Sequence, residues 1–176
     1  MTIYKISYCT NSRLLEKSAQ ILQECALTLS SLLKVYRDIK GDSIFDHARR
    51  QDLLTAMFSY SVAGLDSVLK QAMRDSFNGA NLKYDSSTDC IQSPDEFIKI
   101  TSKLDISIDM IVDDIARLGE IFLHQNKILQ ETDLSFEGSQ MVTNYSTEEI
   151  IDSVNYLIEI AENFLKEIDR RLKVAA

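Results

Sequence analysis

Apolar residues recur at steps of three and four along most of the chain, and this spacing limits the folds that are open to it. Since 3.6 residues complete one turn of an α-helix, such residues share one helix face. The sequence holds five glycines and one proline in 176 residues, which leaves few tight turns and disfavours a many-stranded β fold. The first stripe contains Leu15, Ala19, Leu22, Leu29 and Ile39.

Start and stop signals divide the chain into four helical segments. Ser93 precedes Pro94 and lies three residues before Glu96, which is the pattern of a helix start. Ser146 stands in the same relation to Glu149, and the first stripe is followed by a glycine. The sequence therefore predicts four main helices, at about residues 12–40, 47–77, 93–124 and 146–173.

These helices predict an all-α fold, a single-domain antiparallel helix bundle that spans residues 1–176. Residues 1–11 are expected to form an N-terminal arm or the lead-in to the first helix. The polar segments 78–92 and 125–145 are expected to be irregular loops. A break near Asp105 is considered, but the apolar phase is kept through it, so the third helix is predicted as continuous.

Charge and composition exclude several classes of protein. The net charge is −8, whereas binding to the phosphates of a nucleic acid needs clustered Lys and Arg. We therefore expect no DNA binding. RNA binding would need a local basic patch. The first residues lack a signal-peptide layout, and no apolar run reaches the roughly 18 residues needed to cross a bilayer. The three cysteines, Cys9, Cys25 and Cys90, show no metal or disulfide spacing. We expect a soluble cytoplasmic protein with no membrane partner.

No common catalytic motif is present, and no metal or cofactor is expected. The chain lacks a Gly-rich phosphate loop and the GxSxG, HExxH and EF-hand spacings. Carboxylates gather on the third predicted helix, but a di-iron bundle also needs Glu-x-x-His motifs, which are absent. A solvated acidic face is the simpler interpretation of these carboxylates. They are Asp109, Asp113, Asp114 and Glu120.

The segment FLHQNKILQETDLS, residues 122–135, has the most distinctive sequence. Here the chain resembles the HEPN superfamily, in particular the RiboL-PSP-HEPN and MAE-type toxin-like domains. Many members carry Arg-Asn-x-x-x-His at this place. The present chain has Gln125 and Gln130 where those members have Arg and His, and Asn126 matches their Asn.

Two further stretches carry the same resemblance. Residues 46–77 look like the second helix of the family, with Arg49 and Arg50 near the start and the step Gly64-Leu65-Asp66. Residues 145–172 look like its closing helix. The resemblance covers about residues 12–173, and it implies a bundle whose motif clefts face each other in a dimer.

The resemblance also implies what the lost residues would have done. In active members, without metal, a ribose 2′-hydroxyl attacks the adjacent phosphate, the His moves protons and the Arg holds the phosphate charge. A glutamine neither titrates near pH 7 nor carries a charge. Losing a general acid or base costs about 10² to 10⁴ in rate. We therefore expect that Gln125 and Gln130 leave no cleavage by the family mechanism.

Other residues of the chain could replace the Arg and His that active members of the family use. His124 could act as a base with Arg49 or Arg50 supplying charge, although His124 is more simply a helix-end residue and the two arginines are equally well ordinary surface charge. Asp66 is most simply a polar group satisfied within the bundle, and His47 a surface residue.

Three functional hypotheses follow. The first is a binding, regulatory or structural subunit of a prokaryotic toxin–antitoxin or antiviral system, which forms a homodimer or a heteromer with a protein of the same system. The second is a divergent metal-independent endoribonuclease that uses His124 with Arg49 or Arg50. The third is an unrelated helical bundle in which the Gln-Asn segment matches by chance. The acidic charge favours a protein partner over bare RNA.

Overall fold

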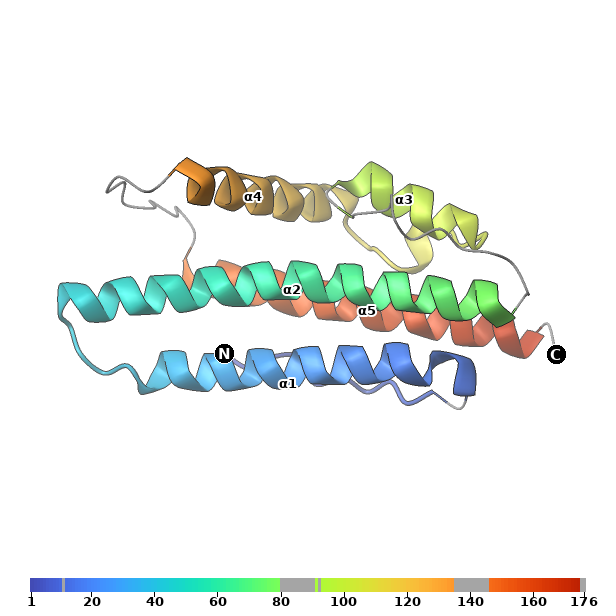
Figure 1. The fold of residues 1–176 in the computed structure, drawn as a ribbon, viewed down its shortest axis with the longest axis horizontal. Coiled ribbons are helices and arrows are strands. Elements are labelled where there is room, and N and C mark those ends of the chain that lie inside the picture. Colours follow the sequence, from blue (N-terminus) through green and yellow to red (C-terminus); the bar gives the residue numbers. More distant parts are fainter. Residues whose placement is uncertain (11, 80–90, 92, 135–145, 175–176) are drawn as a thin grey trace.

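The computed structural model describes residues 1–10, 12–79, 91, 93–134 and 146–174. Every regular element within them is helical, which confirms the predicted all-α bundle. Each long helix runs opposite to the one before it; α1 and α5 pack against α2, while α3 and α4 lie across from α1 (Figure 1). The elements are two 3₁₀ turns, η1 (Arg13–Leu15) and η2 (Ile108–Met110), and the helices α1 (Glu16–Asp38), α2 (Ile44–Gly79), α3 (Pro94–Lys103), α4 (Ile115–Leu134) and α5 (Thr147–Val174).

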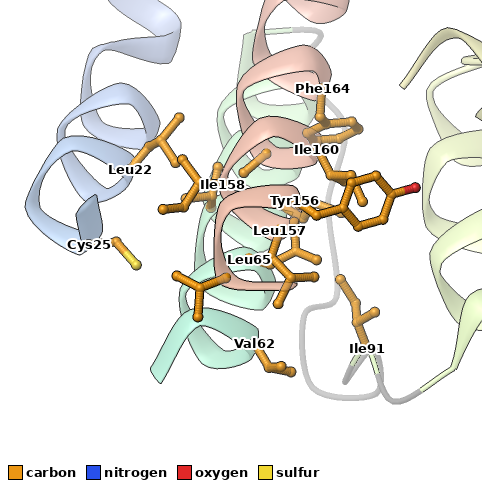
Figure 2. Packing of buried hydrophobic residues seen from close by; sticks show 14 of the residues in the cluster. Leu22, Cys25, Val62, Leu65, Ile91, Tyr156, Leu157, Ile158, Ile160 and Phe164 are labelled. Carbon is orange, nitrogen blue, oxygen red and sulfur yellow. The ribbon is translucent and has the colours of Figure 1, made fainter. Parts of the chain in front are cut away.

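The core lies around α2 and α5, because the apolar stripes of the other helices converge on these two. Leu22 of α1, Leu65 of α2 and Ile158 of α5 belong to this core (Figure 2). Fully burying an aliphatic or aromatic side chain of this size contributes about 1.5 to 3 kcal/mol. The four largest of the fully buried side chains are Phe58, Phe97, Phe122 and Phe164.

The predicted helix starts at Ser93 and Ser146 are present. The Ser93 hydroxyl accepts the Glu96 backbone N–H at 3.3 Å. Ser146 forms a reciprocal capping box, in which Glu149 N donates to its hydroxyl at 3.2 Å and its own N–H donates to Glu149 Oε2 at 2.6 Å.

The predicted continuous helix over residues 93–124 is wrong, because it is divided into α3 and α4. The α3 terminus is a Schellman motif: Ile106 N donates to Thr101 O at 3.1 Å, and Asp105 N donates to Ser102 O at 2.9 Å. Asp105 is left-handed, with φ 56°. The periodicity missed the break because Ile106 and Ile111 beyond it are also buried and keep the apolar phase.

Two other predicted boundaries also move. Residues 125–134, expected to be irregular, continue α4; the rest of that predicted loop, 135–145, lies outside the described residues, as do 80–90 and 92. Helix α2 starts at Ile44 rather than near residue 47. Its start is a second reciprocal box, since Asp46 N donates to Ser43 Oγ at 3.1 Å and Ser43 N donates to Asp46 Oδ2 at 3.3 Å.

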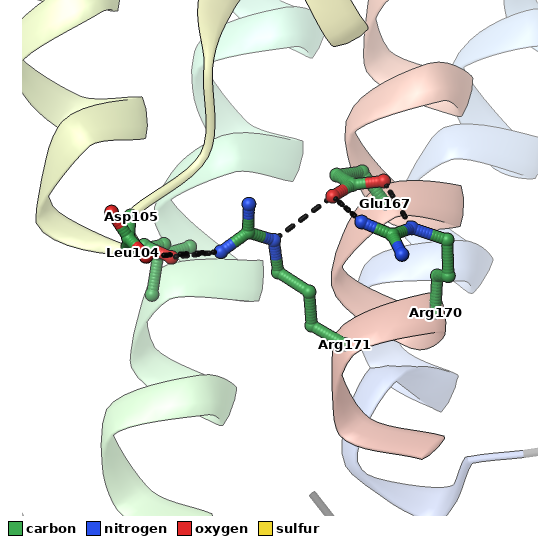
Figure 3. A network of polar contacts seen from close by, with 5 residues as sticks. All are labelled: Leu104, Asp105, Glu167, Arg170 and Arg171. Carbon is green, nitrogen blue, oxygen red and sulfur yellow. Dashed lines mark hydrogen bonds and ion pairs between the residues drawn. The ribbon is translucent and has the colours of Figure 1, made fainter. Parts of the chain in front are cut away.

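An arginine–carboxylate network near the end of α5 holds the turn that follows α3 (Figure 3). Glu167 accepts Arg170 at 2.7 and 2.8 Å and Arg171 at 2.9 Å. Arg171 Nη1 reaches Leu104 O at 3.4 Å and lies 3.6 Å from Asp105 Oδ2. Because the two guanidinium groups bind the carboxylate, the pKa of Glu167 falls to about 2. The network ties α5 to the Schellman turn.

None of the helices in the described ranges combines the length and apolarity needed to cross a bilayer.

Of the cysteines in the described ranges, Cys9 is exposed and Cys25 is buried. Burial raises the pKa of the Cys25 thiol to about 11.

Candidate functional site

The predicted site residue His124 lies in the floor of a pocket between α2, α4 and α5. Its side chain is 6 % exposed, and its ring lies against the fully buried ring of Phe58, with centroids 4.5 Å apart. Ile121, one turn earlier on α4, completes an apolar floor. The pocket has a volume of about 210 Å³, which suits one side chain or a small molecule.

The walls of the pocket are mostly charged. Arg117 and Glu120 come from α4, while Glu149, Asp152 and Ser153 come from the first two turns of α5. Three carboxylates therefore face one guanidinium. The Ser146 N–H and hydroxyl lower the pKa of Glu149, so this wall residue is ionised at neutral pH.

Arg117 is held at the edge of the pocket by an aromatic ring. Its guanidinium carbon lies 4.3 Å from the centre of the Tyr156 ring. Tyr156 is itself fixed, because its hydroxyl donates to Asp114 O at 2.8 Å and accepts Asp114 N at 3.1 Å. Burial raises the pKa of Tyr156 to about 12, so its phenol stays protonated and keeps donating.

The two arginines proposed as substitutes do not line this pocket. They precede Phe58 on α2 by eight or nine residues, which is about 12 to 13 Å along the helix axis. Arg50 donates from Nε to Ile39 O at 3.2 Å and so caps the end of α1. Arg49 is exposed. The structure does not bring Arg49, Arg50 and His124 together in this pocket.

Asp66 also lies apart from the pocket, eight residues beyond Phe58 on α2. Its Oδ1 accepts the Ile91 backbone N–H at 3.1 Å, and its Oδ2 pairs with Lys70 at 2.7 Å. The first of these contacts anchors Ile91, three residues before α3, to the bundle. The predicted surface residue His47 is exposed.

The segment that resembles the family motif, residues 125–130, lies on helix α4 rather than in a loop. Gln125 and Asn126 are half-buried, and within the described part of the chain no hydrogen-bond donor reaches the buried Gln125 Oε1. The side chain of Gln130 lies outside the described residues.

Sequence reasoning missed most of the pocket walls. Glu120 was included only in a solvated acidic face, and Glu149 only as a helix cap. Arg117, Asp152 and Ser153 occupy outer faces of their own helices, so no periodic signal marks them. They become neighbours because the first half of α4 and the start of α5 line the same pocket. In the described ranges, no group of three metal-ligating side chains is positioned to hold an ion.

Comparisons with protein-family models, with curated proteins and with solved structures find no match to this chain.

Proposed function

We propose that this chain is a catalytically degenerate HEPN-like subunit that acts by binding another protein, as a homodimer or in a heteromer. In this proposal, the pocket above His124 receives a basic side chain of the partner. The observation that carries it is the placement of His124 beneath Glu120, Glu149 and Asp152, apart from Arg49 and Arg50. A setting in a toxin–antitoxin or antiviral system rests on the sequence resemblance alone.

The electrostatics of the pocket support a cationic occupant. Among the described lining residues, a phosphate placed there would face three carboxylates and a single cation, Arg117, so these walls would repel an RNA backbone. A guanidinium or ammonium group would instead be attracted to Glu120, Glu149 and Asp152, and its apolar stem would lie against Phe58 and Ile121.

The ribonuclease alternative is tested by incubating the purified chain with total tRNA and with structured RNA in the absence of metal. We expect no cleavage above buffer, because Arg49 and Arg50 do not line the pocket that holds His124. Metal-independent cleavage that is lost in the His124→Ala variant would overturn the proposal.

Binding is tested with a fluorescent hexa-arginine peptide, and with hexa-citrulline as the neutral probe of the same shape. Glu120→Gln with Asp152→Asn should weaken hexa-arginine binding about three- to tenfold, since each charge contact contributes up to about 1 kcal/mol. The matched control is Glu16→Gln with Glu24→Gln, which changes the net charge equally on the exposed face of α1. Equal weakening in both double variants would show attraction to net charge rather than to the pocket.

A further inference from the structure

The N-terminal arm, residues 1–10, lies along α5 and α1 and contains neither helix nor strand. Its trace passes beside α1 before the chain enters that helix (Figure 1). Three polar side chains of α5 bind the arm, and they stand seven residues apart: Asn155, Glu162 and Asp169. They form one polar line down the helix.

Asn155 and Glu162 bind the backbone of the arm. Asn155 Oδ1 accepts Tyr4 N at 2.7 Å, and Asn155 Nδ2 donates to Thr2 O at 3.0 Å. Glu162 Oε1 accepts Ser7 N at 2.9 Å and Tyr8 N at 2.6 Å. These backbone groups of the arm are therefore satisfied by side chains of α5 rather than by a neighbouring strand.

Side-chain contacts complete the docking. The Ser7 hydroxyl donates to Glu162 Oε1 at 2.8 Å, and the Thr10 hydroxyl lies 3.4 Å from Asp169 Oδ1. The Glu162 side chain is fully buried and pairs with Lys166 at 3.2 Å. Removing one partner of a buried charged group leaves that group with an unpaid desolvation cost, so Glu162 strongly favours an occupied groove.

The spacing of the arm matches the spacing of α5. Tyr4, Ser7 and Thr10 are three residues apart, which corresponds to about 10 Å in an extended chain. Seven residues of α-helix rise about 10.5 Å. The two periods therefore stay in register over the whole arm, and the α5 line selects an extended segment rather than a turn or a helix.

On its α1 side the arm fills the groove incompletely. A cavity of about 400 Å³ lies between Ile3, Ile6 and Leu27, and one of about 560 Å³ lies between Cys9 and Gln20. The arm is thus held by polar contacts to α5 and by Tyr8, which is buried, more than by close packing on α1. Its one charged side chain, Lys5, is exposed and lines the first of these cavities.

We propose that the groove between α1 and α5 is a binding site for an extended arm, and that a second copy of this chain can supply that arm. None of the contacts above depends on the arm belonging to the same chain, so an exchanged arm remakes every one of them. A tethered arm competes at an effective concentration of about 1 mM. Exchange therefore becomes visible when the resident arm is weakened. This inference concerns the groove between α1 and α5, and it does not use the pocket above His124.

The test is complementation between two full-length variants. Ser7→Pro removes the N–H and hydroxyl that Glu162 accepts and leaves the groove intact. Glu162→Leu removes the acceptor and leaves the arm intact. We expect their mixture to form a 1:1 dimer, seen by native mass spectrometry with one copy isotopically labelled, in excess over either variant alone.

The matched control is Ser7→Ala mixed with Glu162→Leu. Ser7→Ala keeps the backbone N–H, so its own arm stays in place and the mixed dimer should be reduced at least about tenfold. Circular dichroism melts establish that each variant is folded. If Glu162→Leu does not fold, Asn155→Leu is the second groove variant. A mixture of folded variants that shows no excess of mixed dimer at about 1 mM overturns the proposal.

Discussion

The Tyr156 hydroxyl both donates to and accepts from the backbone of Asp114, the residue that caps α4. Asp114 Oδ1 in turn accepts Arg117 N at 3.0 Å. Tyr156→Phe should lower the free energy of unfolding by about 1 to 2 kcal/mol, because two part-buried backbone groups lose their partner. Urea denaturation measures this, with Tyr60→Phe on the exposed face of α2 as the control. An equal loss of unfolding free energy in the Tyr156→Phe and Tyr60→Phe variants would contradict the role of the Tyr156 hydroxyl in holding Asp114.

Gly64 of α2 faces Cys25 of α1. A β-carbon at Gly64 would lie 2.4 Å from Cys25 Sγ. Gly64→Ala should therefore destabilise the chain by about 1 to 2 kcal/mol, although Ala is the better helix former. In a Cys25→Ala background the same substitution should become neutral or stabilising, because the obstructing sulfur is gone. Thermal melts of the wild type, the two single variants and the double variant give the coupling energy between positions 25 and 64. Additive effects of the two substitutions would contradict this packing.

Stability should depend on the ionisation of Glu167 at low pH. Its pKa is lowered from 4.5 to about 2 by Arg170 and Arg171, so its contribution is fully present above pH 4.5 and lost as the pH falls towards 2. Glu167→Gln should lower stability by about 1 to 2 kcal/mol at pH 6, since the two guanidinium groups are partly exposed. Denaturation curves from pH 6 to pH 2 should converge for wild type and variant. A constant difference over this range would count against the assignment.

Asp105 occupies the left-handed position of the Schellman turn, where glycine is the favoured residue. Asp105→Gly should be at least as stable as wild type, because it relieves the left-handed strain and loses only an exposed contact with Arg171. Asp105→Val should be less stable than Asp105→Gly by about 1 to 2 kcal/mol. Equal stability of the two variants would show that the turn relaxes to another conformation.

Much of the fold could be predicted from the sequence because helix period and caps are local. The stripes beginning at Leu15 and Ile150 predicted buried faces, and the Ser146 box predicted the start of α5. The break after α3 could not be predicted in this way. Asp105, rather than Gly, occupies the left-handed position, and buried residues beyond it continue the apolar phase.

For the candidate site too, some features could be predicted from the sequence and others could not. His124 was identified from a motif along the chain, and its helix follows from the period. The separation of His124 from Arg49 and Arg50 could be seen only in the packing of α4 against α2. The sequence alone does not show which part of α2 lies beside which part of α4. The same holds for Asp152 and Ser153, which belong to the pocket only through the position of α5.

By itself, the sequence determined the helical class and the buried stripes. The tertiary structure decided which polar residues meet: an acidic pocket above His124, and a line of α5 side chains that binds the N-terminal arm. The physical reason is the distance along the chain over which each interaction acts. Periodicity and capping act within a few residues, whereas the neighbours of Glu162 in the arm lie more than 150 positions away and are set by how whole helices pack.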